Sequence, residues 1–117
     1  MTILVVEDEP AVLTLIERLL SAKGHTVLAA HDPDDAAFVL AENGNPPDML
    51  LTDIILPGRT GLEYAQAMKA AYPSMKVVFM TGWAHRAPSA LRTGLGPVLR
   101  KPFTAKELYD AIEDENG

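Results

Sequence analysis

Five short apolar runs alternate with helix-like segments along this chain, and that alternation constrains the fold more than any other feature. The runs lack the polar alternation of a half-buried strand, so each predicts a strand buried on both faces of a sheet. The predicted strands cover residues 3–6, 26–30, 49–52, 77–80 and 98–100. Because every connection is long enough for a right-handed crossover, we expect a doubly wound parallel α/β sheet with helices on both faces.

Start and stop signals place helices in the connections between the strands. Asp32 is typical of a helix start, Gly44 of a helix end, and the sequence Thr-Ala-Lys-Glu from Thr104 is a capping-box pattern. The predicted helices cover residues 10–23, 33–43 and 61–71, with a last helix after Thr104. Proline and glycine interrupt residues 83–96, so we predict a short or mobile fourth helix, at most over residues 88–92.

The composition bounds the class of protein. The 117 residues suit one domain, and 48% of them are hydrophobic, which is enough for a core. The lack of cysteine excludes disulfides and thiolate metal sites. A net charge of −6 disfavours nucleic-acid binding, which needs a basic face. The N-terminus is unlike a signal peptide and no apolar run approaches the ~20 residues of a membrane span, so we predict a cytoplasmic protein that binds neither nucleic acid nor membrane.

Chemically useful side chains follow four of the five predicted strands. Glu7 and Asp8 follow the first strand, Asp53 the third, Thr81 the fourth and Lys101 the fifth. Any one of them alone would more often be a turn, cap or surface residue. The carboxyl ends of parallel strands, however, lie along one edge of the sheet, and ligands bind there. We therefore expect these side chains to gather at a single site.

Three carboxylates at one site repel one another unless a cation lies among them. Oxygen ligands without histidine or cysteine favour Mg²⁺, with Mn²⁺ as a substitute. A carboxylate beside such an ion can attack a phosphoryl group and form an aspartyl phosphate. The ammonium of Lys101 can then stabilise the developing negative charge, and the hydroxyl of Thr81 can donate a hydrogen bond to a phosphoryl oxygen.

The order and spacing of these residues resemble the response-regulator receiver domains of two-component signalling, of the chemotaxis-regulator type, from end to end of the chain. The matching motifs are Val5-Val6-Glu7-Asp8-Glu9-Pro10, Asp53 with Pro57 and Gly61 at successive intervals of four, Thr81-Gly82, and Lys101-Pro102-Phe103. The resemblance implies a flavodoxin-like fold with five parallel strands in the order 2-1-3-4-5. We predict a single receiver domain over residues 1–117, without an output domain.

The resemblance also implies a role for each matching residue at the metal site. Asp53 would be the phosphoacceptor. Glu7, Asp8, Asp53 and the backbone carbonyl of Ile55 would hold Mg²⁺, or Mn²⁺ in its place.

A second group of residues would bind the phosphoryl group. These would be Thr81, Lys101 and the backbone amides of Ile55 and Gly82, while Pro102 would follow a cis peptide bond. The phosphodonor would be a phosphohistidine on a histidine kinase or phosphotransfer protein. The domain would then switch a face that binds a downstream protein, and its last helices are our candidate for a homodimer surface.

The chain departs from the family pattern near the phosphoryl site. Val98 stands where the family often has an aromatic switch residue, so this part of the switch is absent or is supplied elsewhere, with Trp83 and Phe103 as candidates that are more often packing residues. We predict that the domain is no enzyme beyond its own phosphorylation and slow self-dephosphorylation, because Ile55 and Trp83 are poorly suited to orient an attacking water. A phosphoryl half-life of seconds with Mg²⁺ would contradict this prediction.

Alternative functions fit the sequence less well. A haloacid-dehalogenase-like phosphatase would have a second aspartate at Ile55, and a nucleotide-binding module would have a glycine-rich loop in place of Glu7-Asp8-Glu9. A receiver-like scaffold that is never phosphorylated remains open, and substitution of Asp53 by asparagine separates it from a phosphoacceptor. A stand-alone regulator and the receiver part of a hybrid histidine kinase both remain open as architectures.

Overall fold

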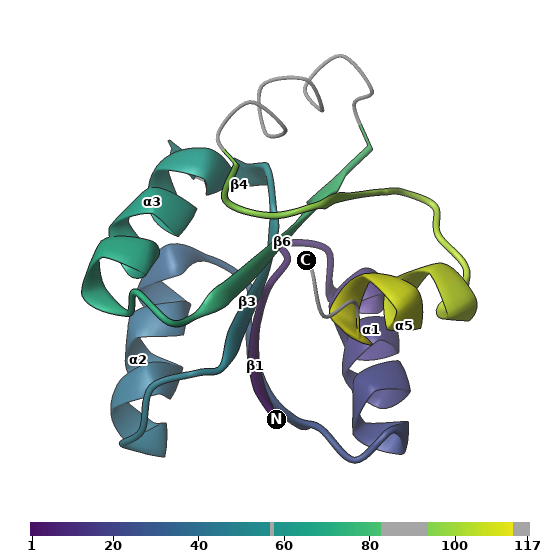
Figure 1. Cartoon of the computed structure of the whole chain (residues 1–117), viewed down its shortest axis with the longest axis horizontal. Helices are drawn as coiled ribbons and strands as arrows, with labels where there is room; N and C mark the ends of the chain where they lie inside the picture. The colour runs from purple at the N-terminus through teal and green to yellow at the C-terminus, as the bar shows by residue number, and fades with distance from the viewer. Residues whose placement is uncertain (57, 83–93, 114–117) are drawn as a thin grey trace.

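The chain folds around a five-stranded parallel sheet (Figure 1). The computed structural model describes residues 1–56, 58–82 and 94–113. The strands of the sheet are β1 (Thr2–Val6), β2 (Thr26–Ala30), β3 (Met49–Asp53), β6 (Lys76–Thr81) and β7 (Val98–Arg100). Their order is β2-β1-β3-β6-β7 and every neighbouring pair is parallel. This arrangement confirms the predicted order 2-1-3-4-5 for the five sheet strands.

Helices cover both faces of this sheet. The described residues form α1 (Pro10–Ala22), α2 (Pro33–Asn43), α3 (Gly61–Ala71) and α5 (Ala105–Glu113). Figure 1 shows α2 and α3 on one face of the sheet and α1 and α5 on the other. Each pair of helices buries its own hydrophobic cluster against the strands, as expected for a doubly wound sheet.

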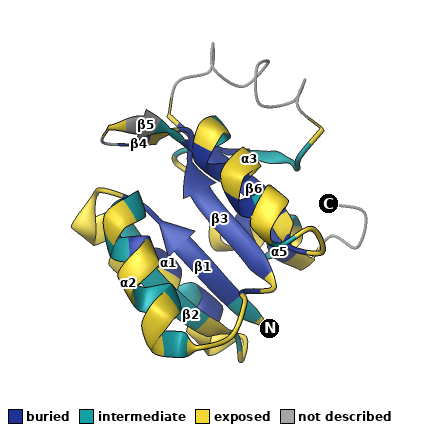
Figure 2. Cartoon of the chain, turned by 90° about the vertical axis from the view of Figure 1, so that its left-hand side faces the viewer, coloured by how far each residue is buried: buried dark blue, intermediate teal, exposed yellow. Residues whose placement is uncertain are grey.

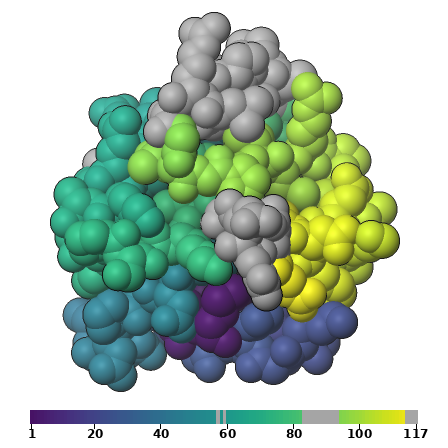
Figure 3. Space-filling model, viewed as in Figure 1, coloured from purple at the N-terminus to yellow at the C-terminus, as the bar shows by residue number. Residues whose placement is uncertain are grey.

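The central strands carry core side chains on both faces. Along β3, Leu50 belongs to the cluster beneath α2 and α3, and Leu51 belongs to the cluster beneath α1 and α5. Successive side chains of a strand point to opposite faces, so a strand covered on both sides has no place for a polar alternation. In Figure 2 β1 and β3 are accordingly buried, while the outer sides of the helices are exposed. In the space-filling view the N-terminal residues show as a small area between the surfaces of α1 and α2 (Figure 3).

The predicted helix ends are confirmed by their hydrogen bonds. The carboxylate of Asp32 accepts a hydrogen bond from the amide of Asp35 at 2.7 Å and caps α2. At the other end of α2, Gly44 has a φ of 78°, a left-handed conformation that glycine adopts without strain. Thr104 and Glu107 form reciprocal bonds of 3.0 and 3.1 Å at the start of α5, which is the predicted capping box.

The segment between β3 and α3 contains more structure than the sequence predicted. Instead of a plain loop, β4 (Ile55–Leu56) and β5 (Arg59–Thr60) form a short antiparallel ribbon. A second capping box follows, in which Glu63 donates its amide to Thr60 Oγ1 at 3.1 Å and accepts the amide of Thr60 at 3.3 Å. The sequence Thr60-Gly-Leu-Glu63 carries the signal for this cap, and our sequence reading missed it.

Two predictions fall on residues outside the described ranges. The short fourth helix over residues 88–92 and the position of Trp83 both lie between residues 83 and 93. In the part of the chain that the structure describes, each helix is too short or too polar to cross a membrane.

Candidate functional site

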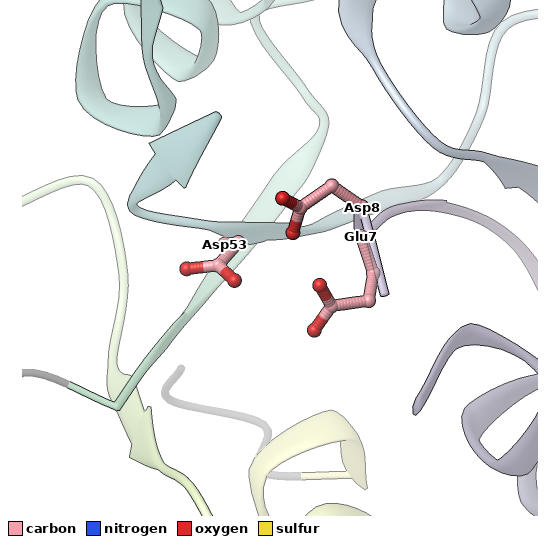
Figure 4. Close-up of side chains that lie close together, drawn as sticks. All are labelled: Glu7, Asp8 and Asp53. Atoms are coloured by element: carbon pink, nitrogen blue, oxygen red, sulfur yellow. The ribbon is translucent and has the colours of Figure 1, made fainter. Parts of the chain in front are cut away.

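The carboxyl ends of β1 and β3 bring three acidic side chains together. Glu7 and Asp8 follow β1, and Asp53 ends β3 (Figure 4). One carboxylate oxygen from each residue lies within 4.8 Å of the others. Glu7 is fully buried, Asp53 is 8% exposed and Asp8 is exposed. The predicted acidic cluster therefore forms, with Glu7 on the side of the core and Asp8 on the side of the solvent.

Lys101 lies between two of these acids. Its ammonium donates hydrogen bonds to Glu7 Oε1 and to Asp53 Oδ2, the latter at 2.6 Å. Its side chain is only 17% exposed, so water screens these ion pairs weakly. Lys101 lies 94 positions from Glu7 and 48 positions from Asp53 in the sequence, and the structure confirms that the three side chains meet at one site.

Burial and pairing act against each other on the charges of this site. Burial raises the pKa of Glu7 above its usual range, although Lys101 and the amide of Glu9 both stabilise the carboxylate. Burial alone would lower the pKa of Lys101, but its bonds to Asp53 and Glu7 outweigh burial and raise it. The ammonium of Lys101 therefore stays protonated at neutral pH, whereas the carboxyl group of Glu7 takes up a proton at a higher pH than an ordinary glutamate does.

Backbone contacts hold Lys101 at the edge of the sheet. Its amide donates to the carbonyl of Thr81 at 2.8 Å, which ties the end of β7 to the end of β6. The peptide bond between Lys101 and Pro102 is cis, as the family resemblance implied. This hydrogen bond fixes the backbone of Lys101 beside the end of β6, and its side chain reaches the acidic cluster.

The first residues after β3 complete the site. The amide of Ile55 donates to Asp53 Oδ1 at 3.3 Å, and the Ile55 side chain is 40% exposed. The amide of Gly61 donates to the carbonyl of Ile54. A Cβ atom built on Gly61 would overlap the carbonyl oxygen of Asp53 and lie 2.9 Å from Ile54 Cα. Glycine at this position lets α3 approach the phosphoacceptor candidate closely, which explains the Gly61 of the sequence motif.

A small pocket opens over the acidic cluster. It is lined by Asp8, Glu9, Asp53, Ile55, Gly82 and Lys101. Thr81 is 1% exposed and lies at the end of β6, directly before Gly82. The structure therefore places Gly82 on the wall of the pocket and Thr81 in the buried layer beside it.

Sequence reasoning missed the part played by Glu9. The Glu9 amide donates to Glu7 Oε2 at 3.2 Å, and the residue lines the pocket. The only signal in the sequence was its place in the run Glu7-Asp8-Glu9, which identifies a turn but not a hydrogen bond. A backbone donor of this kind helps to orient a buried carboxylate.

An apolar groove adjoins this pocket and was also not predicted. It is lined by Glu9, Val12, Leu15, Gly82, Lys101, Pro102 and Phe103. Leu15 is 52% exposed, and Phe103 packs against the cluster beneath α1 and α5. Phe103, one candidate for the missing aromatic switch residue, is thus a packing residue that lines the groove. Val98 is partly buried against the cluster beneath α2 and α3, on the other face of the sheet.

The arrangement fits a hard divalent cation. All the donors of the acidic cluster are carboxylate oxygens, and they lie close enough to share one ion. A phosphoryl group on Asp53 would face an ammonium and the amide of Ile55, which are groups that stabilise such a charge.

Comparisons with known proteins agree with this geometry. The family model described as "Response regulator receiver domain" matches residues 3–113. The sensor kinase CckA of Brucella abortus is 30% identical over 97% of the chain, which spans only 12% of that kinase. The solved receiver domain of the hybrid histidine kinase CckA has 32% identity, complete coverage of both chains and a TM-score of 0.80.

A second solved structure that the chain resembles is a response regulator in complex with Mg²⁺ and BeF. The TrrA protein of Thermotoga maritima, in complex with Mg²⁺ and BeF, is 25% identical over 96% of each chain with a TM-score of 0.82. The match of the family model to nearly the whole chain, with the acidic cluster and lysine at one site, shows that this protein belongs to the response-regulator receiver domain family of two-component signalling.

Proposed function

We propose that Asp53 accepts the phosphoryl group in this receiver domain, and that Glu7, Asp8, Asp53 and the carbonyl of Ile55 hold Mg²⁺, for which Mn²⁺ can substitute. The observation that carries the proposal is the meeting of three carboxylates and one ammonium at a single site. When bound, the cation neutralises part of the charge of the carboxylates and of the transferred group.

The transfer needs few parts from the protein. A carboxylate oxygen of Asp53 attacks phosphorus, the new O–P bond forms, and the N–P bond of a phosphohistidine breaks with its electron pair passing to the imidazole. Lys101 already holds Asp53 Oδ2, so its ammonium needs only a small movement to follow charge onto the phosphoryl oxygens. Thr81 and the amides of Ile55 and Gly82 supply hydrogen bonds to that group.

The phosphodonor would be a phosphohistidine on a histidine kinase or phosphotransfer protein. Its approach to Asp53 passes the apolar groove, which shares Glu9, Gly82 and Lys101 with the phosphoacceptor pocket. Exposed Leu15 beside this opening offers apolar contact area to a protein donor. One receiver unit over residues 1–117, alone or as part of a hybrid kinase, would work in the cytoplasm, where ATP supplies the kinase.

The phosphorylated domain would act on a downstream protein rather than on nucleic acid. The outer side of α5 is charged, with Lys106 paired to Asp110 at 2.8 Å, and this polarity suits a reversible contact. A homodimer through the last helices would use the same side. Light scattering with and without a beryllium fluoride mimic tests it, since a monomer in both states contradicts the homodimer.

Self-dephosphorylation would be slow. Ile55 lines the pocket with an exposed apolar side chain, which has no group to orient an attacking water. We expect the aspartyl phosphate to persist for minutes in the presence of Mg²⁺. A half-life of seconds would contradict the prediction of slow self-dephosphorylation.

Substitution of the phosphoacceptor tests the proposal directly. Asp53→Asn keeps the size of the side chain but removes the nucleophilic carboxylate, so phosphorylation by acetyl phosphate or by a phosphorylated kinase should disappear. Asp110→Asn is the matched control, because Asp110 lies on the exposed side of α5. Intact-mass spectrometry counts the phosphoryl groups. Equal labelling of Asp53→Asn and wild type would overturn the assignment, and unchanged binding of the downstream partner by Asp53→Asn would favour the scaffold.

A further inference from the structure

A buried polar residue lies directly before the phosphoacceptor and has no part in the proposed chemistry. The described residues contain four buried polar or charged side chains: Glu7, Thr52, Asp53 and Thr81. Three of these belong to the proposed site. Thr52 is 0% exposed near the carboxyl end of the central strand β3, where a valine would bury more apolar surface and need no hydrogen bond.

The hydroxyl of Thr52 donates to the backbone carbonyl of Asp53 at 3.0 Å. The side chain cannot enter the pocket, because successive residues of a strand point to opposite faces. Thr52 shares the face of Leu50, beneath α2 and α3, whereas Asp53 shares the face of Leu51. Any influence of Thr52 on the site therefore passes through the backbone.

The Asp53 carbonyl, which accepts the hydrogen bond from Thr52, lies just beyond the last residue pair of β1 and β3. The ladder between β1 and β3 ends at the pair Val6 and Thr52, one residue before Asp53. The same carbonyl lies so close to Gly61 that a Cβ there would overlap it. The hydroxyl of Thr52 therefore bonds to a carbonyl that the start of α3 also approaches closely.

The orientation of this carbonyl sets the geometry of the residues that follow. It belongs to the peptide plane between Asp53 and Ile54, and a rotation of that plane moves both the Asp53 side chain and the backbone of Ile55. The Ile55 amide already reaches Asp53 Oδ1 at 3.3 Å, near the outer limit of a hydrogen bond. A small rotation would break this bond and displace the Ile55 carbonyl.

We propose that Thr52 is a positioning residue for phosphoryl transfer: its hydroxyl fixes the Asp53 carbonyl and thereby aligns the phosphoacceptor with Ile55. The inference rests on the proposed function of Asp53 and adds a residue from outside the pocket to it. A shift of ~1 Å in reacting groups costs up to about 100-fold in rate, so loss of the hydroxyl should slow phosphorylation measurably.

Two substitutions separate positioning from packing. Thr52→Val removes the hydroxyl and keeps the branched shape, whereas Thr52→Ser keeps the hydroxyl and leaves a small void. We expect Thr52→Val to lower the rate constant of phosphorylation by acetyl phosphate by about tenfold or more, and Thr52→Ser to stay within about threefold of wild type. Urea unfolding of each variant shows whether the rate follows stability.

Mg²⁺ affinity gives a readout that does not depend on phosphorylation. Calorimetric titration should show weaker binding for Thr52→Val than for Thr52→Ser or wild type, and the amide resonance of Ile55 should shift only in Thr52→Val. Wild-type rates and Mg²⁺ affinity in Thr52→Val, or losses that track stability in both variants, would overturn the inference. If wild type itself takes up no phosphoryl group, the proposed function fails, while the Mg²⁺ ranking still decides the role of Thr52.

Discussion

Gly61→Ala should weaken both the fold and the phosphoacceptor site. A Cβ on Gly61 would overlap the Asp53 carbonyl oxygen and lie 2.9 Å from both the carbonyl carbon and Ile54 Cα, whereas real Cβ contacts essentially never fall under 3.0 Å. The opposing atoms belong to the backbone, so a change of side-chain rotamer cannot relieve the contact. The start of α3 and the end of β3 must therefore move apart.

The size of the effect follows from that movement. Overpacking a well-packed region by one methyl group costs roughly 1–3 kcal/mol. Alanine gains up to about 1 kcal/mol over glycine inside a helix, but less at the first residue of α3, so the free energy of unfolding should fall by roughly 1–2 kcal/mol. A displacement of about 1 Å at Asp53 would also slow phosphorylation by as much as ~100-fold.

Urea unfolding and phosphorylation by acetyl phosphate measure the two effects. Gly82→Ala is the control for stability, because a Cβ there meets nothing within 4 Å. Gly96→Ala is the control for the site, because its Cβ would overlap the Val77 carbonyl oxygen near the amino end of β6 instead. We expect Gly96→Ala to lose stability but to keep more of its phosphorylation rate. A Gly61→Ala protein as stable and as active as wild type would refute the reasoning.

The charges of the site support two further predictions. Lys101→Met leaves the carboxylates of Glu7 and Asp53 without their ammonium partner, so the free energy of unfolding without Mg²⁺ should fall by roughly 3 kcal/mol. Mg²⁺ should restore part of this loss of stability. Equal urea midpoints for the variant and the wild type in metal-free buffer would contradict the prediction. Because burial raises the pKa of Glu7, protonation of Glu7 should begin to compete with Mg²⁺ at a pH above its ordinary pKa of 4.5, with up to a tenfold loss of affinity per pH unit below the actual pKa. Calorimetric Mg²⁺ affinities that begin to fall only near pH 4.5 would show that Glu7 titrates normally or is not a ligand.

The candidate site was largely predictable because its residues follow strands whose ends must share one edge. Glu7, Asp8, Asp53 and Lys101 meet as expected. The residues around them were harder to predict. Glu9 contributes its backbone amide, which donates to the carboxylate of Glu7. The role proposed for Thr52 depends on its hydrogen bond to the backbone carbonyl of Asp53. A sequence pattern records side chains, so these contributions of the backbone leave no signal in it.

The sequence by itself determined the local features of this protein. Apolar runs, glycines, prolines and capping residues specify where strands and helices begin and end, because each of these effects acts within a few residues. Only the tertiary structure decided that Lys101 bonds to Glu7 as well as Asp53, and that α3 approaches β3 so closely that Gly61 admits no side chain. Those facts depend on the twist and packing of the whole sheet, which bring together atoms from distant parts of the chain at distances no local pattern encodes.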